Sequence, residues 1–391
     1  MPEFEETEEE RMIRNSVSSL MDEYEDDYWR EIEEERGFPE EVWQDLADHG
    51  YVGIAIPEEY GGEGMGIKEM VTVMEEVGMN GGWSATVAFV LNPIFGGETL
   101  VAHGTEEQKE QWLPKIASGD AKWALGVTEP DAGLNTSNIS TIAEKDGDGY
   151  VINGSKIWTS RVAEADRITL LARTLPPEDA DSPTHGLSIF LVDPDSDGID
   201  YDEIPLDIYF ERTYNLYLDD VRVHESQIVG TEHQGLYHIF DTLNTERITV
   251  AAAAVAAGYS ALDQAADYAN DREVFGVPIG SHQAIQHPLA DAYAELETAK
   301  LMTHKAAWMY DNDKPSQEVG AAANSAKLQA GKAAWNACEA AMTTFGGMSA
   351  SSEIGIAKLW SMVRHLRVAP VSEQMVRNYL AENELGLPRS Y

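Results

Sequence analysis

The strongest limit on the fold of this chain is a change of residue pattern that divides it into three parts. From Glu8 to about Gly119 apolar residues recur near helical spacing, as Val42 and Leu46 do in EEVWQDLADHGYVGIA. Around Ala124 the pattern changes to short runs rich in β-branched residues, and after about Gly235 the chain is Ala-rich and helical again. The sequence therefore predicts an α+β protein with a helical, a β and a second helical domain.

The middle segment should form antiparallel β-structure. Its β-rich runs include TSNISTIAEK, YVINGSKIWTS, RITLLART, GLSIFLVD and LYLDDVRV. These runs are short, spaced as in hairpins and never alternate with helices, which disfavours a doubly wound parallel sheet. We expect an antiparallel β-barrel or sandwich over residues 124–234, between a helical domain at 1–123 and a helical bundle at 235–391.

Helices are expected on both sides of this segment. In the first domain the pattern predicts helices at about 67–80, 84–103 and 105–118. In the last domain it predicts long helices at 237–270, 283–312, 316–344, 353–367 and 371–385. Several long helices in succession favour a bundle.

The charge balance excludes several classes of partner. The chain has 27 Lys and Arg against 69 Asp and Glu, a formal net charge of -42. Such a charge repels phosphate backbones and anionic lipid head groups, so we expect neither nucleic-acid nor membrane binding. The acidity fits an ordinary acidic enzyme or a protein of a salt-rich cytoplasm, and we favour the salt-adapted, halophilic interpretation.

Several further expectations rest on features that the sequence lacks. The single cysteine, Cys338, excludes an internal disulfide and every multi-cysteine zinc site, and it fits a packed thiol on an Ala-rich helix. The start of the sequence does not resemble a signal peptide, and we find no window of about 18 apolar residues. We therefore expect a cytoplasmic protein. Ten scattered histidines without zinc-type spacing predict no metal site.

Five short motifs, weak singly, occur in an order and spacing that resemble the acyl-CoA dehydrogenase family over nearly the whole chain. They are Pro57–Gly62, Val127–Pro130 with Ala132-Gly133, Gly154–Trp158, Arg272–Gly276 with Gln283, and Phe345–Gly347. The resemblance implies α,β-dehydrogenation of an acyl-CoA thioester with FAD as cofactor. It also implies transfer of electrons to electron-transfer flavoprotein, and a homo-oligomer, usually a tetramer, whose subunits share the FAD sites.

The resemblance assigns one group of residues to the flavin ring. A flat, electron-poor ring needs hydrogen bonds around its edge and aromatic or apolar cover. By resemblance Val127, Thr128 and Gly133 supply edge contacts, Trp158 packs on the ring, and the hydroxyl group of Ser160 reaches the reactive ring nitrogen. Taken alone, Trp158 could equally be a core aromatic residue of a sheet.

A second group resembles the positions that hold the diphosphate and adenine of FAD, mostly of an FAD bound in a neighbouring subunit. These residues are Arg272, Phe275, Gln283, Gly346 and Gly347. Arginine offers paired donors to a diphosphate, although Arg272 alone would suggest an ordinary helix-end ion pair. Ser372 and Gln374 match further flavin-contacting positions.

The catalytic base departs from the usual position in the family. Most members carry the glutamate near the C-terminus, where this chain has Pro370, which can neither accept a proton nor donate a backbone hydrogen bond. The other family position corresponds to Glu246, at the start of an apolar helix, and we predict Glu246 as the base. The alternatives are that Glu246 forms an ion pair on a solvated turn, or that Glu373 is the base.

Two residues are expected near the substrate. Arg247 matches a family residue that faces the CoA arm, and Leu134 replaces the serine that commonly lies near CoA. Two other functions remain open at this point: an acyl-CoA oxidase of the same fold, and a non-catalytic flavin-binding or assembly protein, which Pro370 would explain. In so acidic a chain Arg247 and Arg272 should matter for binding phosphates.

Overall fold

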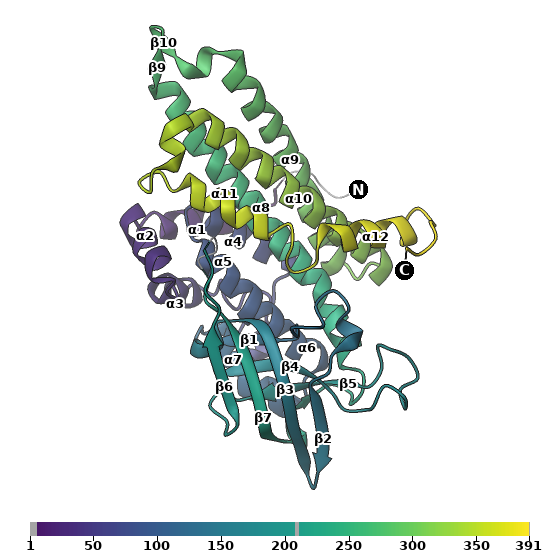
Figure 1. Ribbon diagram of the computed structural model, residues 1–391. Helices are drawn as coiled ribbons and strands as arrows, with labels where there is room; N and C mark the ends of the chain where they lie inside the picture. The colour runs from purple at the N-terminus through teal and green to yellow at the C-terminus, as the bar shows by residue number, and fades with distance from the viewer. Residues whose placement is uncertain (1–5, 208–210, 391) are drawn as a thin grey trace.

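A computed structural model describes residues 6–207 and 211–390, and in it the chain forms three parts (Figure 1). The first part is helical, and Thr7 and Thr105 each cap a helix through a capping box. Its elements are α1 (Glu8–Met21), α2 (Asp26–Glu35), α3 (Glu40–Asp48), η1 (Glu58–Tyr60), α4 (Ile67–Met79), α5 (Trp83–Phe89), η2 (Val90–Glu98), α6 (Thr99–His103) and α7 (Glu106–Ala117).

The single helix expected at 84–103 has a wide, π-helical middle section. Its hydrogen bonds change register at η2, which contains Pro93, a residue without an N–H to donate. Trp83–His103 has a mean hydropathy of 1.4 and is long and apolar enough to cross a membrane, so the expectation that no such window exists was wrong. However, 72% of that window is buried inside the molecule, as in a core helix.

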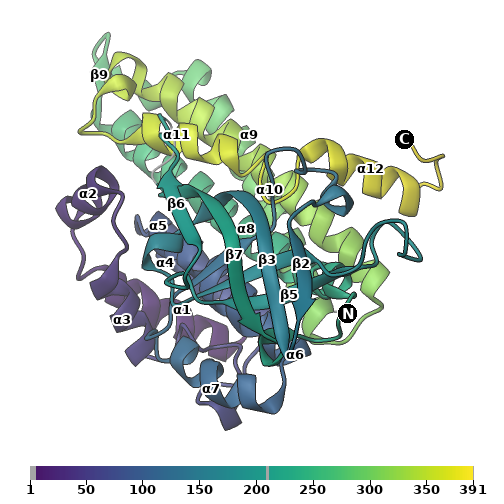
Figure 2. The same ribbon diagram turned by 60° about the horizontal axis from the view of Figure 1, so that its bottom comes forward.

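The middle part is one twisted sheet of eight strands. Figure 2 shows β6, β7, β3 and β2 side by side at the front, with helices behind them. The strand order is β6-β7-β3-β2-β4-β5-β8, and β1 pairs with β4. The strands are β1 (Trp123–Gly126), β2 (Ile142–Asp146), β3 (Gly149–Ser160), β4 (Arg167–Arg173), β5 (Leu187–Val192), β6 (Ile199–Glu203), β7 (Thr213–His224) and β8 (Ile228–Val229).

The sheet corrects the expectation of an antiparallel barrel or sandwich in two ways. Among the described strands it is open, with β6 and β8 at the two ends of the path. It is also mixed, because β1 runs parallel to β4 from Trp123 beside Arg167 to Gly126 beside Leu170. A parallel pair needs a long crossover, which the segment between β1 and β4 provides, and strand runs in a sequence do not reveal such pairing.

The last part is a bundle of long helices with a small hairpin. The observed helices lie close to the predicted ranges, and the largest difference is at α11, expected from 353 and observed from Ile356. Its elements are α8 (Gly235–Asp271), β9 (Glu273–Val274), β10 (Val277–Pro278), η6 (Ile279–Ser281), α9 (Gln283–Asp311), α10 (Ser316–Phe345), η7 (Gly346–Ala350), α11 (Ile356–His365) and α12 (Glu373–Asn383).

Helix α8 connects all three parts. From Ile248 to Gly258 it is buried on all sides, and its buried alanines share one hydrophobic core with α4, α9 and α10. Its first turns pack differently, because Leu236 and Ile239 belong to the core formed with β1, β5 and α7. The helix therefore runs from the sheet into the bundle, and residues 243–247 lie where the two cores meet.

Candidate active site

Glu246 lies on α8 and is almost completely buried. Its residue exposure is 5%, and its Oε2 atom has no hydrogen-bond partner among the described residues. Burial raises the pKa of this carboxyl group to about 8, although the positive charges of Arg247 and Lys327 act to lower it. A buried carboxyl group with a free oxygen can accept a proton, which the solvated ion pair considered from the sequence would not offer.

Two cations accompany this carboxyl group. Arg247 is half-buried, and its Nη1 lies 3.4 Å from Oδ1 of Asn244, while burial lowers its pKa. Lys327 on α10 is 2% exposed, and burial lowers its pKa to about 8. Lys327 is not among the site residues predicted from the sequence. One feature of the sequence could have indicated it: a single lysine stands among alanines at helical spacing, on the helix face that must be buried.

The alternative base, Glu373, is held in ion pairs. It bonds to Arg367 and, at 2.8 Å, to Nη2 of Arg377. The hydrogen bond from Arg367 is the main cause that lowers the pKa of Glu373 to about 2. A carboxylate so strongly compensated is a poor proton acceptor at neutral pH. Pro370 lies in the exposed segment between α11 and α12, three residues before Glu373.

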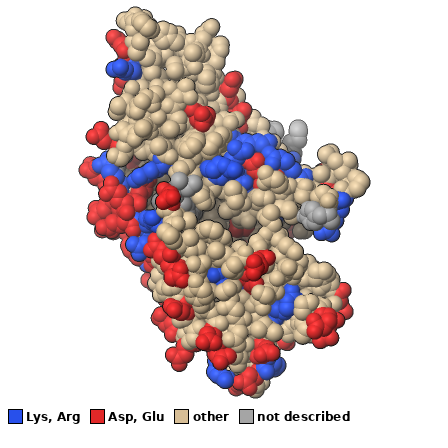
Figure 3. Space-filling model, in the orientation of Figure 1, with Lys and Arg blue, Asp and Glu red and all other residues tan. Residues whose placement is uncertain are grey.

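Cations gather near this segment. Figure 3 shows a group of Lys and Arg side chains around the connection between α11 and α12, above a hollow between the sheet and the helical bundle. Acidic side chains form separate groups on the outer surface in the same view, the largest of them at the left. Cations therefore gather at this place although the chain as a whole is strongly acidic.

The residues predicted to contact the flavin ring lie at adjacent ends of β1 and β3. The backbone N–H of Ile157 donates to the carbonyl oxygen of Thr128 at 2.9 Å, which joins the two motifs. Trp158 has a φ of +65° and is 52% exposed, at a bulge where the pairing of β3 with β7 shifts. The bulge turns the indole outward, so Trp158 is not the core aromatic residue of the alternative interpretation.

Three other predicted residues lie around these strand ends. Ser160 pairs with Thr213 at the end of β3 and is partly exposed. Val127 packs against the same core as Leu243, three residues before Glu246, which ties the end of β1 to α8. Gly133 lies in an exposed loop where a Cβ atom would meet nothing within 4 Å, and its neighbour Leu134 is 63% exposed.

A second group of predicted residues lies at the opposite end of α8. Arg272 follows Glu246 by 26 positions, which at ~1.5 Å per residue is roughly 40 Å along the helix. Phe275 in the following hairpin is 94% exposed, and Gln283 begins α9. Gly346 and Gly347 follow Phe345, whose ring lies 4.7 Å from that of Tyr268 near the same end of α8. One chain therefore does not bring the two groups together.

Ser372 and Gln374 lie at the start of α12. The side chain of Ser372 caps this helix by accepting the N–H of Met375 at 3.3 Å, while Gln374 is exposed. Both therefore lie near the ion pairs of Glu373. No cluster of three or more metal-ligating side chains occurs in the part of the chain that the structure describes.

Comparison with known proteins identifies the family. Profiles of three acyl-CoA dehydrogenase domains match in order: the N-terminal domain at residues 7–120, the middle domain at 124–221 and the C-terminal domain at 233–385. Acyl-CoA dehydrogenase fadE12 of Mycobacterium bovis is 39% identical over 391 residues, 99% of both chains. This chain belongs to the acyl-CoA dehydrogenase family.

Two further comparisons extend this result. The caffeyl-CoA reductase-Etf complex subunit CarC of Acetobacterium woodii is 32% identical to this acyl-CoA dehydrogenase over 370 residues, 94% of this chain and 95% of the relative. A solved structure of a glutaryl-coenzyme A dehydrogenase with glutaryl-CoA superposes with a TM-score of 0.91 at 29% identity. That superposition covers 99% of this chain and 98% of the other.

This acyl-CoA dehydrogenase is an oxidoreductase that binds FAD and oxidises acyl-CoA. The strand ends fit the flavin ring: Trp158 offers a flat exposed surface, Ser160 a hydroxyl group, and the open loop at Gly133 room for close approach. When bound, FAD supplies the acceptor for a hydride. The residues that would hold it are those named above on β1, β3 and their loops.

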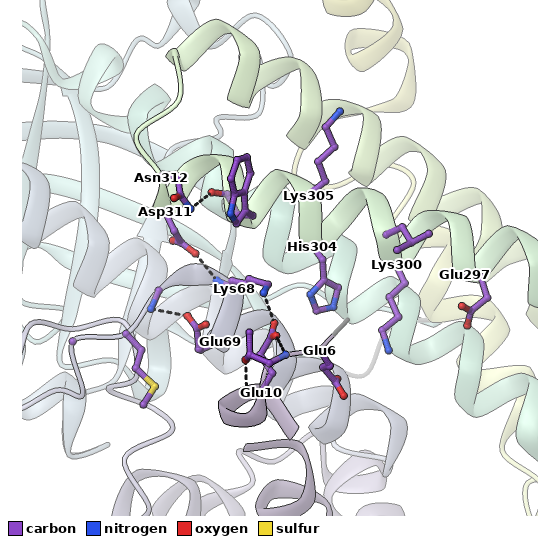
Figure 4. Close-up of a pocket in the computed structure, with 16 residues that line it drawn as sticks. Glu6, Glu10, Lys68, Glu69, Glu297, Lys300, His304, Lys305, Asp311 and Asn312 are labelled. Atoms are coloured by element: carbon purple, nitrogen blue, oxygen red, sulfur yellow. Dashed lines mark hydrogen bonds and ion pairs between the residues drawn. The ribbon is translucent and has the colours of Figure 1, made fainter. Parts of the chain in front are cut away.

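A separate groove lies elsewhere in the molecule. It has a volume of about 960 Å³ and lies between α1, the start of α4 and α9 (Figure 4). Several of its charged groups pair with one another: Lys68 lies 2.8 Å from Glu10, and Asp311 accepts two backbone N–H groups at the start of α4. None of the predicted site residues lines it, so we place the chemistry at Glu246.

Proposed function

We propose that this enzyme converts an acyl-CoA thioester to the 2-enoyl-CoA, with Glu246 as the base that removes the α-proton. One observation carries this proposal: Glu246 is a buried carboxyl group with an unpartnered oxygen, on the helix that joins the sheet to the bundle. The two competing positions are unsuitable, because Pro370 has no ionisable group and Glu373 is ion-paired.

The proposed reaction balances with two acceptors. Glu246, in its ionised form, would take the α-proton, and bound FAD would supply the acceptor for the β-hydride that leaves as the carbon–carbon double bond forms. Burial of Glu246 excludes water and makes the carboxylate more basic. Arg247, the next residue, would face the CoA arm, and its positive charge would balance the anionic substrate. Leu134 would lie beside CoA on the exposed loop.

The substitution Glu246→Gln tests the base. We expect the variant to keep its yellow FAD but to lose bleaching by acyl-CoA by roughly a hundredfold or more, since general bases contribute at least that much. Glu373→Gln is the matched control and should still bleach. The measurement is anaerobic stopped-flow absorbance with a panel of straight, branched and aromatic acyl-CoA thioesters. Wild-type rates in Glu246→Gln would remove Glu246 from the mechanism.

We further propose that electrons pass to electron-transfer flavoprotein. The support is similarity to a relative that is named as a subunit of a complex with such a flavoprotein. Anaerobic reduction by substrate, followed by addition of either air or the flavoprotein, tests the acceptor. Rapid reoxidation by air alone would favour the oxidase alternative. Absence of bleaching with every thioester would favour a non-catalytic flavin protein.

We also propose a homotetramer in which subunits share FAD sites. The support is the separation within one chain, where Arg272 lies roughly 40 Å from Glu246 at ~1.5 Å per helical residue. Residues at the two ends of α8 would then serve different FAD molecules, each completed by another copy of the chain. Analytical ultracentrifugation of the holoenzyme measures the oligomeric state, and a monomer with full FAD content would contradict this proposal.

A further inference from the structure

The end of β3, which carries expected flavin contacts, contains two non-glycine residues in the left-handed region of the backbone. Trp158 has a φ of +65° and Arg161 a φ of +61°, and Ser160 lies between them. Residues with a side chain adopt this conformation rarely, and it persists only where the surrounding structure holds it. Contacts around the end of β3 must therefore fix the turn that presents Ser160.

The side chain of Arg161 makes such contacts with two other segments of the chain. It is 4% exposed, and its Nε donates to Oε2 of Glu211 at 2.5 Å. Its Nη2 donates to the carbonyl oxygen of Gly37 at 3.0 Å and its Nη1 to that of Arg36 at 3.4 Å, both in the connection between α2 and α3. A guanidinium group carries its donors in a rigid fork, so these contacts fix its orientation.

The backbone and a ring contact add to this arrangement. The N–H of Arg161 donates to the carbonyl oxygen of Arg212 at 3.1 Å, and Thr213, the next residue, pairs with Ser160 across the strands. The guanidinium carbon of Arg161 lies 5.6 Å from the centre of the Phe38 ring, within reach of a cation–π contact. Arg161 therefore joins the end of β3 both to the start of β7 and to the first helical part.

We propose that Arg161 is a positioning residue for the flavin: by tying the end of β3 to Glu211 and to the α2–α3 connection, it holds the turn that directs the hydroxyl group of Ser160 to the ring. Ser160 directly precedes Arg161, so loss of the guanidinium group would release the left-handed turn and let the hydroxyl group move. This inference rests on the expected placement of the flavin ring at these strand ends, and it does not depend on Glu246.

The midpoint reduction potential of bound FAD tests this role. A donor at the reactive ring nitrogen withdraws electron density from the flavin and favours its reduction, so a displaced donor lowers the potential. The potential is measured on the holoenzyme by equilibration with a reference dye during slow reduction, without any acyl-CoA. The dissociation constant of FAD, measured by titration of the apoenzyme, is the second value.

The main variant is Arg161→Met/Glu211→Met, which removes both charges of the buried pair. Buried ion pairs often tolerate replacement by apolar residues, and the net charge is unchanged, so the potential reports position alone. The matched control is Arg36→Met/Glu203→Met. The side chain of Arg36 also joins the α2–α3 connection to the middle part, through Glu203 at 3.1 Å and the carbonyl oxygen of Leu206 at 3.0 Å.

We expect the potential to fall in Ser160→Ala and in Arg161→Met/Glu211→Met, and to fall no further when the three substitutions are combined. The dissociation constant of FAD should rise by roughly three- to tenfold, as for the loss of one hydrogen bond. The control variant should keep both wild-type values. Arg161→Lys gives the same information if the main variant does not fold, because lysine keeps the charge beside Glu211 but lacks the fork.

An unchanged potential in the folded Arg161 variant, even with lowered thermal stability, would overturn the proposal and leave a structural role. Shifts that add in the combined variant would also overturn it, because Arg161 would then act by a route other than Ser160.

The Ser160→Ala variant distinguishes the two levels of failure. An unchanged potential in Ser160→Ala would mean that this hydroxyl group does not meet the ring, and the inference about Arg161 would fall with that placement. A potential that falls in Ser160→Ala but not in the Arg161 variants would overturn only the role of Arg161. Neither result bears on Glu246 as the base, since no thioester is present.

Discussion

Nζ of Lys156 lies 2.9 Å from Oε1 of Glu129, and both side chains are buried between β3 and the loop after β1. Glu129 also accepts the backbone N–H groups of Ser140 and Thr141, at 2.7 and 2.9 Å. Lys156 donates in addition to the carbonyl oxygen of Val127 at 3.2 Å. This buried pair holds strand β3 to the loop after β1, and these two segments carry the expected flavin contacts.

Lys156→Met should destabilise the protein and weaken FAD binding. The substitution leaves Glu129 buried without its cation, which costs about 3–5 kcal/mol when one partner of a buried pair is removed. Urea unfolding and the release of FAD on gel filtration measure the two effects. Lys145→Met is the matched control, because the ion pair of Lys145 with Glu225 is exposed and should contribute little. Equal stability of the two variants would contradict this prediction.

The rate of flavin bleaching should increase as the pH rises through about 8, the raised pKa of Glu246, because the base acts in its ionised form.

The effect of the same carboxyl group on the stability of the fold has the opposite sign. Between the unfolded pKa of 4.5 and about 8 the folded state retains a proton that the unfolded state loses, so this group reduces stability as the pH rises. Single-turnover rates and urea unfolding across pH measure both. The stability effect should vanish in Glu246→Gln.

Two inactive variants should restore activity when their chains are mixed. Arg272→Ala changes the C-terminal end of α8, and Glu246→Gln changes a position roughly 40 Å away on the same helix. If each site combines Glu246 of one chain with Arg272 of another, a mixed oligomer contains some sites in which both residues are native. Random assembly makes roughly a quarter of such sites intact, since each of two positions is native with probability one half. Coexpression followed by an activity assay measures this. Mixtures as inactive as the parents would show that each site belongs to one chain.

Thermal stability and activity should be retained or should rise as salt is added. The net charge of -42 produces self-repulsion, which salt screens within about 3 Å at 1 M compared with about 8 Å at 0.15 M. Melting temperature and bleaching rate in a KCl series measure the response. A collapse of activity with added salt would contradict the salt-adapted interpretation of the composition.

Short-range patterns predicted most of the secondary structure. The long helices of the bundle lie near the predicted ranges, and so does α7, predicted at 105–118 and observed at Glu106–Ala117. These features depend on residues within a few positions of each other, so local sequence is sufficient. The parallel pairing of β1 with β4 depends on a crossover of some forty residues, from 127 to 166, and no local pattern contains it.

The candidate site also has some features that the sequence predicts and others that only the tertiary structure decides. The resemblance to the family indicated Glu246 and placed Pro370 at the usual position of the base, and local sequence supported the choice, because a carboxyl group at the start of an apolar helix is unusual and proline cannot accept a proton. Only packing brought Lys327 of α10 near Glu246 of α8, and only packing paired Glu373 with Arg367 and Arg377. The physical reason is that burial and charge compensation arise between elements distant in sequence, whereas propensity and capping act within one element.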